Sequence, residues 1–61
     1  MKLRELMIAY PNIKRIDIYC EAVGYSFSYA PDDSELDMDM VVNAYEVLGN
    51  NNEILYIGDD N

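Results

Sequence analysis

The sequence of 61 residues has no histidine, no tryptophan, a single cysteine and only four basic residues. Without histidine the chain cannot build a Ser-His-Asp triad or a zinc site of the Cys/His type. One cysteine cannot form an internal disulfide framework, and a lone Cys20 is typical of a reducing compartment. No stretch approaches the roughly 18 apolar residues of a membrane span, and the first residues lack the apolar segment of a signal peptide. We therefore expect a cytoplasmic protein with no catalytic residues, no cofactor and no membrane contact.

The charge of the chain is almost entirely of one sign. Twelve acidic residues give a net charge of −8, and all four basic residues lie within residues 1–15. Residues 16–61 carry a charge of −11 and no basic side chain. Direct binding of nucleic acid requires a basic patch, so this balance argues against it. A one-signed surface keeps a protein soluble, and it also attracts cationic partners from a distance. The partner we expect is a basic protein surface.

The size of the chain limits how stable it is alone. An apolar fraction of 51% excludes a disordered acidic tail. A chain this short buries only about 60% of its unfolded surface. Six tyrosines and one phenylalanine can supply a dense core, because each aromatic buries roughly 150–250 Å². Homodimerisation is the other common remedy for a small core. The composition leaves both remedies open.

The first half of the chain predicts a helix and then a β-hairpin. Apolar residues between Leu3 and Tyr10 recur at helical spacing, and Pro11 follows them, which predicts a helix over about 2–10. Apolar and polar residues then alternate through residues 15–29, apart from a reversal near the middle of that segment. This period of two predicts a hairpin whose second strand turns its aromatic side chains toward the helix and its serines away from it.

The second half of the chain has two interpretations. One is a single helix over 35–48, because Ser34 resembles an N-cap and apolar residues recur at helical spacing, namely Met38, Val41, Val42 and Tyr45. The other is a short helix over about 35–43, followed by a hairpin of strands near 44–49 and 53–58. A glycine and three asparagines between those strands are strong turn formers, so we favour the second interpretation.

These patterns together predict one α+β domain over residues 1–61. An antiparallel β-sheet made of two hairpins packs on the N-terminal helix, with a second short helix beside it. The predicted core comprises Leu3, Leu6, Met7, Tyr10, Ile16, Ile18, Phe27, Val42, Leu55 and Ile57.

The most distinctive motif is a run of acids, namely Asp32, Asp33, Glu35, Asp37 and Asp39. Its spacing partly fits a calcium-binding loop, but Met40 stands where that loop requires glycine, so we expect no metal site. If the run is extended, alternate carboxylates on one face lie about 6.6–6.8 Å apart, which is comparable to the phosphate spacing of nucleic acid. If it is helical, the acids form a well-capped helix start. Pairs of carboxylates are inevitable in a chain with twelve acids, so we expect no enzyme.

Two tyrosines are further candidates for contact with a partner. Tyr19 lies opposite Ile18 and Cys20 in its strand, and Tyr56 lies opposite its apolar neighbours in the last strand. Alternation therefore places both on the face turned away from the core. Exposed tyrosines beside acids are typical of a binding hot spot for an arginine-rich partner. They could equally cover the second face of the sheet in a homodimer.

Four short patterns follow one another along the chain: Leu3-x-x-Leu6, Ile16-Asp17-Ile18-Tyr19, Glu46-Val47 and Ile54-Leu55-Tyr56-Ile57. This order resembles the small acidic proteins common in phages and prophages. Some of those proteins are anti-CRISPR proteins or other inhibitors of host nucleic-acid enzymes. The resemblance implies a DNA-mimicking inhibitor in the host cytoplasm, directed at the basic channel of a Cas9-type CRISPR effector nuclease. It assigns no functional residue position by position.

The competing hypothesis comes from a different class of protein. In it the chain is a small self-associating structural or assembly protein of phage or bacterial origin, with no nuclease target. The tyrosine and isoleucine faces would then join identical copies, and the acids would only keep the assembly soluble.

Overall fold

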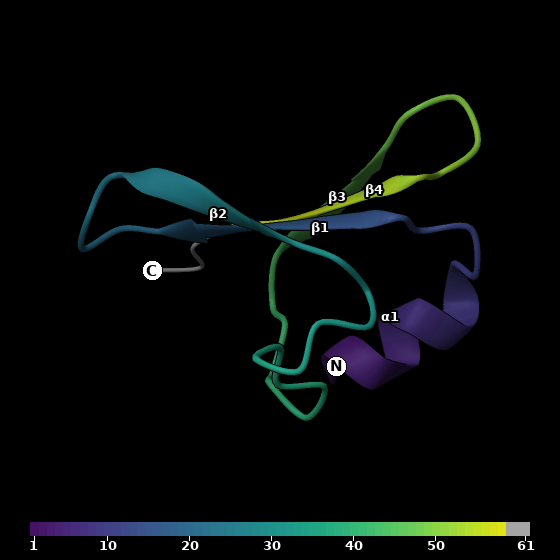
Figure 1. Ribbon diagram of the computed structural model, residues 1–61, viewed down its shortest axis with the longest axis horizontal. Coiled ribbons are helices and arrows are strands. Elements are labelled where there is room, and N and C mark those ends of the chain that lie inside the picture. Colours follow the sequence, from purple (N-terminus) through teal and green to yellow (C-terminus); the bar gives the residue numbers. More distant parts are fainter. Residues whose placement is uncertain (59–61) are drawn as a thin grey trace.

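The computed structural model describes residues 1–58, which form one α-helix and one four-stranded sheet (Figure 1). The elements follow the chain in the order α1 (Leu3–Ala9), β1 (Arg15–Cys20), β2 (Tyr25–Tyr29), β3 (Tyr45–Leu48) and β4 (Ile54–Ile57). This is an α+β arrangement, as the sequence predicts. The first helix and both hairpins form within two residues of their predicted bounds.

The sheet is mixed, with the strand order β2-β1-β4-β3. Each hairpin is antiparallel as predicted, but the two hairpins join through β1 and β4, which run parallel. The prediction of a wholly antiparallel sheet was therefore wrong. Alternation shows which side chains share a face, but it does not show which strands are neighbours or in which direction they run. Here β1 and β4 hold the buried Ile16 and Leu55 opposite one another, so the apolar strands occupy the centre of the sheet.

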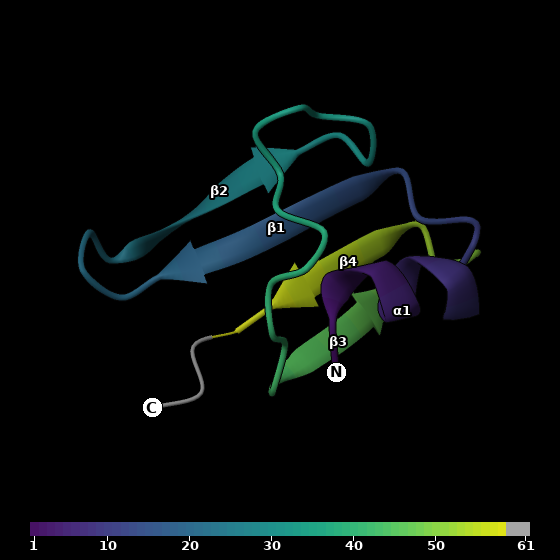
Figure 2. The same cartoon turned by 90° about the horizontal axis from the view of Figure 1, so that it is seen from below.

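All of the remaining described chain except the connecting turns lies on one face of the sheet (Figures 1 and 2). We call this the inner face; α1 and residues 30–44 lie on it, and no described element covers the opposite, outer face. The core between the inner face and these segments comprises Leu3, Leu6, Ile13, Ile16, Leu36, Val42, Leu55 and Ile57.

The predicted core is largely correct. Six of its members are buried, and Met7, Tyr10 and Ile18 pack half-buried against them. Phe27 was predicted wrongly, since it is 40% exposed. It is the middle residue of β2, opposite Ile18 of β1. The β1–β2 hairpin extends beyond the part of the sheet that α1 covers (Figure 2). Ile13 and Leu36 are buried although the sequence pattern did not single them out.

The predicted second helix is absent from residues 31–44, which corrects both the helix over 35–43 and its alternative over 35–48. Three turns replace it, closed by N–H to carbonyl hydrogen bonds from Asp33 to Ala30 (3.1 Å), Leu36 to Asp33 (3.1 Å) and Met40 to Asp37 (3.2 Å). The carboxylates of Asp33 and Asp37 also accept hydrogen bonds from the backbone N–H two residues further on, at 2.9 and 3.0 Å. Aspartates that bond their own backbone in this way favour turns over a helix.

We call residues 32–42 the acidic ribbon. Within it the apolar side chains point inward at every second position, and the residues between them are exposed. The helical pattern was misleading because it required Val41 in the core, where the structure leaves that side chain 64% exposed. The inward positions are Leu36, Met38, Met40 and Val42, and the outward ones are Glu35, Asp37, Asp39 and Val41.

Candidate functional site

The acidic ribbon is held against the N-terminus by backbone hydrogen bonds. The N–H groups of Leu3 and Arg4 donate to the carbonyls of Met40 (3.0 Å) and Met38 (2.9 Å). On the other side of Lys2, the N–H of Val42 donates to the carbonyl of Met1, at 2.6 Å. These bonds satisfy two N–H groups of the first turn of α1 that have no partner within a helix. They also fix the ribbon in place, although it is neither helix nor strand.

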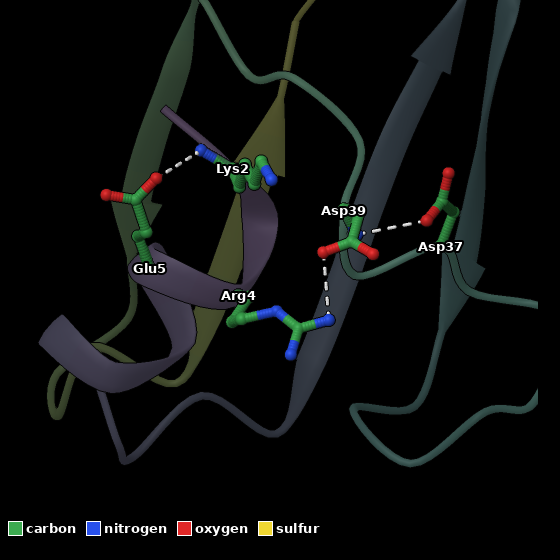
Figure 3. A network of polar contacts seen from close by, with 5 residues as sticks. All are labelled: Lys2, Arg4, Glu5, Asp37 and Asp39. Atoms are coloured by element: carbon green, nitrogen blue, oxygen red, sulfur yellow. Dashed lines mark hydrogen bonds and ion pairs between the residues drawn. The ribbon is translucent and has the colours of Figure 1, made fainter.

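The carboxylates of the ribbon differ in whether they form ion pairs or hydrogen bonds within the protein. Asp39 forms an ion pair with Arg4 at 2.8 Å, and both side chains are more than half exposed (Figure 3). Asp33 and Asp37 each use one oxygen in their own turn and keep the other. The carboxylates of Asp32 and Glu35 make no hydrogen bond or ion pair with any residue of the described part of the chain. The ribbon therefore carries four negative charges without a cationic partner in that part.

The positive charges near the ribbon belong to Lys2 and Arg4, which lie beside the end of the ribbon that contacts α1. Lys2 forms an isolated bridge with Val41, and its backbone N–H donates to Glu5 Oε1 at 2.9 Å (Figure 3). The guanidinium of Arg4 is ion-paired with Asp39. The negative charge of the ribbon is consequently strongest around residues 32–37, away from the helix. An exposed ion pair of this kind is readily exchanged for a contact with a partner, because it is worth less than about 1 kcal/mol.

The predicted site residues do not form one site. The five acids lie on the inner-face side of the molecule, on the ribbon. Tyr19 and Tyr56 lie on the outer face, because their neighbours Ile18 and Ile57 pack into the core. Both tyrosines are half-buried. The sheet thus separates the acids from the two tyrosines, and a single flat partner surface cannot contact both sets at once.

The outer face carries a polar group that the sequence analysis did not identify. Asp17 accepts a hydrogen bond from Ser28 Oγ at 2.7 Å and forms an ion pair with Arg15 at 3.0 Å. Its side chain is only 15% exposed, so both carboxylate oxygens are occupied and largely shielded from water. Tyr56 is the register partner of Asp17 on the neighbouring strand. Opposite charges two residues apart on the outward positions of β1, Arg15 and Asp17, were the signal available in the sequence.

A concavity of about 550 Å³ lies on the inner face, at the end of the sheet that α1 does not reach. Its apolar wall comes from three segments that are far apart in the sequence, and the half-buried thiol of Cys20 faces the same region. Tyr25 and Phe27 extend this apolar end of the inner face, with their ring centroids 5.0 Å apart. The apolar lining residues are Ile18, Ala22, Met40, Val41, Val42 and Ile57.

One tyrosine pair connects α1 to the sheet. The pKa of Tyr45 in β3 is raised above its ordinary value. The first cause is repulsion from the neighbouring Tyr10 when both are ionised, followed by a hydrogen bond between the two side chains and by burial. Tyr10 follows the last residue of α1, so this contact holds the end of the helix against the edge strand of the sheet.

Comparisons with family models, curated proteins and solved structures found no match for this chain. Among residues 1–58, no group of three or more acids or cysteines is arranged to hold a metal ion. The helix in that range is too short to cross a membrane. Function is therefore inferred from the geometry and charge of the acidic ribbon.

Proposed function

We propose that this chain is a non-enzymatic acidic binding protein whose ribbon occupies a basic nucleic-acid-binding surface on another protein. The observation that supports the proposal most is the alternation along the ribbon. Buried or half-buried side chains anchor every second residue to the core, and the carboxylates of Glu35, Asp37 and Asp39 stand between them in solvent. Exposed negative charges are thus presented from a backbone that hydrogen bonds hold in place.

The exposed carboxylates suit a surface that binds phosphates. Turns interrupt the ribbon at residues 33–36 and 37–40, so the rise of an extended strand does not set their spacing. What the ribbon shares with a nucleic-acid strand is a series of negative charges that follow one another closely along one segment. A basic groove that places cations for a phosphate backbone therefore meets several negative charges on the ribbon.

Fixing the ribbon in advance favours binding. A disordered acidic tail loses roughly 1–2 kcal/mol of backbone conformational entropy for each residue that a partner orders. The ribbon loses this entropy when the protein folds and not when it binds, because its three turns and its hydrogen bonds to residues 1–4 are part of the folded chain. Its carboxylates therefore bind with less loss of freedom than the same acids on a flexible segment.

The target class that we place first is a Cas9-type CRISPR effector nuclease. Such an effector holds the guide–target duplex in a positively charged channel, which recognises the duplex through its backbone geometry and charge. The resemblance of this chain to small acidic phage proteins supports the same target and an inhibitory role in the host cytoplasm. The ribbon would compete with the nucleic acid for the channel and would need no catalytic group of its own.

Neutralising the ribbon tests this proposal. Purified guide-loaded effector is titrated with the labelled protein at low salt, and the wild type is compared with a variant that loses four ribbon charges. Asparagine keeps the oxygen that closes the two aspartate turns, so the backbone should persist. Four surface pairs at roughly 0.2–1 kcal/mol each are worth about 0.8–4 kcal/mol, or about 4- to 800-fold in Kd. The substitutions are Asp33→Asn, Glu35→Gln, Asp37→Asn and Asp39→Asn.

A matched control separates the ribbon from the overall charge. It removes the same number of negative charges at acids outside the ribbon: Glu5→Gln, Glu21→Gln, Glu46→Gln and Glu53→Gln. The proposal predicts that the control binds several-fold more tightly than the ribbon variant, and that the difference narrows as salt screens the charges. Equal losses in the two variants would mean that net charge alone drives binding. No binding by the wild type would remove this target.

A further inference from the structure

The strand β2 forms an open edge of the sheet. It pairs with β1 on one side only, and the strand order places nothing described beyond it. Alternate residues of an edge strand direct their backbone N–H and C=O groups away from the sheet, where they can pair with another strand. Natural proteins protect such edges with charges, prolines or bulges. Between Tyr25 and Tyr29 this strand has none of these.

The charge pattern indicates what can approach this edge. Residues 22–31 form the longest stretch of the chain without a charged side chain, ten residues compared with eight in the next longest, residues 6–13. Two copies of a protein with a net charge of −8 repel one another over most of their surface. Within residues 25–29 the edge of β2 places no acid opposite an acid, and the first acids beyond its two ends are Glu21 and Asp32. The nearest acid in β1, Asp17, is already paired with Arg15.

The sequence of β2 is also palindromic, because it reads the same in both directions: Tyr25-Ser26-Phe27-Ser28-Tyr29. In an antiparallel pair of identical strands related by a two-fold axis, residue i faces residue j and residue j faces residue i. If the axis passes through Phe27, that residue meets its own copy, tyrosine meets tyrosine and serine meets serine. Aromatic pairs then lie on the inner face and serine pairs on the outer face. Both are cross-strand pairs that stabilise a sheet.

From these observations we infer that two copies of this chain join through β2, antiparallel and centred on Phe27, to form one continuous eight-stranded sheet. The proposed dimer pairs the backbone and side chains of β2 and uses no side chain of the acidic ribbon, which begins three residues beyond Tyr29. It therefore does not depend on the function proposed above. It accounts for a strand whose aromatic side chains are left in solvent, since Tyr25 is 56% and Phe27 40% exposed in the single chain.

The extent of the interface indicates a weak dimer. An aromatic side chain buries roughly 150–250 Å² when fully covered, so the exposed parts of Tyr25 and Phe27 offer on the order of 200 Å² in each copy. Stable interfaces bury about 1,200 Å² or more in total. The dimer should therefore dissociate on dilution. Salt should strengthen it by screening the repulsion between the two acidic copies, which is the opposite of its effect on ribbon binding.

Sedimentation equilibrium over a range of protein concentrations tests this inference. We expect exchange between monomer and dimer, with the dimer fraction rising as salt is added. Phe27→Lys places two ammonium groups on the two-fold axis and should give a monomer with an unchanged circular dichroism spectrum. Ile8→Lys is the matched control, because Ile8 is 77% exposed on α1, and it should leave association intact. A wild type that stays monomeric at high salt, or a dimer that Phe27→Lys does not weaken, would overturn the inference.

Cross-linking tests the register without the charge substitution. In a Cys20→Ser background, Phe27→Cys places one thiol opposite its own copy, and oxidation or a short bis-maleimide should link the two chains. Ile8→Cys in the same background measures random collision. We expect the Phe27→Cys variant to form covalent dimers several-fold faster than the Ile8→Cys variant. Equal rates would contradict the proposed register even if some other dimer forms.

Discussion

Leu36 and Val41 provide a direct test of how the acidic ribbon is attached to the core. Leu36 is 9% exposed and belongs to the core, whereas Val41 is 64% exposed. A helix over residues 35–48 would instead place Val41 on the buried stripe. The losses of stability caused by Leu36→Ala and by Val41→Ala therefore distinguish a ribbon with a period of two from a helix.

The expected cost of Leu36→Ala follows from its burial. Leucine to alanine in a core costs about 2–5 kcal/mol, and the lower end applies here because the site lies near the surface and can partly collapse. At about 0.05–0.15 kcal/mol per residue, the whole domain is stable by only about 3–9 kcal/mol. A loss of about 2 kcal/mol is thus a large share of its stability. Val41→Ala removes exposed methyl groups and should cost less than about 0.5 kcal/mol.

Urea unfolding followed by circular dichroism measures both variants. Small domains have m-values from about 1 kcal/mol/M upward, so Leu36→Ala should lower the midpoint by up to about 2 M. Val41→Ala should leave the midpoint nearly unchanged. If Val41→Ala proves as costly as Leu36→Ala, or more so, the ribbon does not lie on the core as described, and its carboxylates do not form a fixed row.

Two further predictions concern contacts of α1. The Arg4–Asp39 ion pair is more than half exposed on both sides, so a double-mutant cycle with alanine at the two positions should give a coupling below about 1 kcal/mol; a larger coupling would show that the pair holds the ribbon in place. Tyr45 should titrate above an ordinary tyrosine in ultraviolet difference absorbance, and Tyr10→Phe should lower its pKa. Because the folded-state pKa is raised, the Tyr10–Tyr45 contact stabilises the fold fully below the ordinary tyrosine pKa, and this contribution is lost as pH rises through the raised value. A Tyr45 that titrates normally in the wild type would contradict this.

The helix and the hairpins could be predicted because local rules agree there. Pro11 ends a stripe of helical spacing, and the alternation through β2 has only one period. The parallel pairing of β1 with β4 could not be predicted, because it depends on two strands separated by most of the chain. Alternation indicates the face of each strand and leaves its neighbour and direction open.

The ribbon was mispredicted because its sequence contains two periods at once. Met38 and Val42 fit both a helical stripe and a period of two, so hydrophobic spacing alone does not decide between them. The side chains of Asp33 and Asp37 decide it, since each closes a turn on the backbone two residues ahead. Asp32, Glu35, Asp37 and Asp39 are exposed in the structure, and Asp33 is half-buried. Their separation from Tyr19 and Tyr56 by the sheet required the three-dimensional arrangement.

Competition between this protein and nucleic acid for one basic surface tests the central claim most directly. Guide-loaded Cas9-type effector is captured on the immobilised protein, and target duplex is then added in increasing excess. If the ribbon occupies the nucleic-acid channel, the effector is released in proportion to the duplex bound, and no complex contains both. A stable complex of protein, effector and duplex together would contradict the claim, because the ribbon would then bind elsewhere.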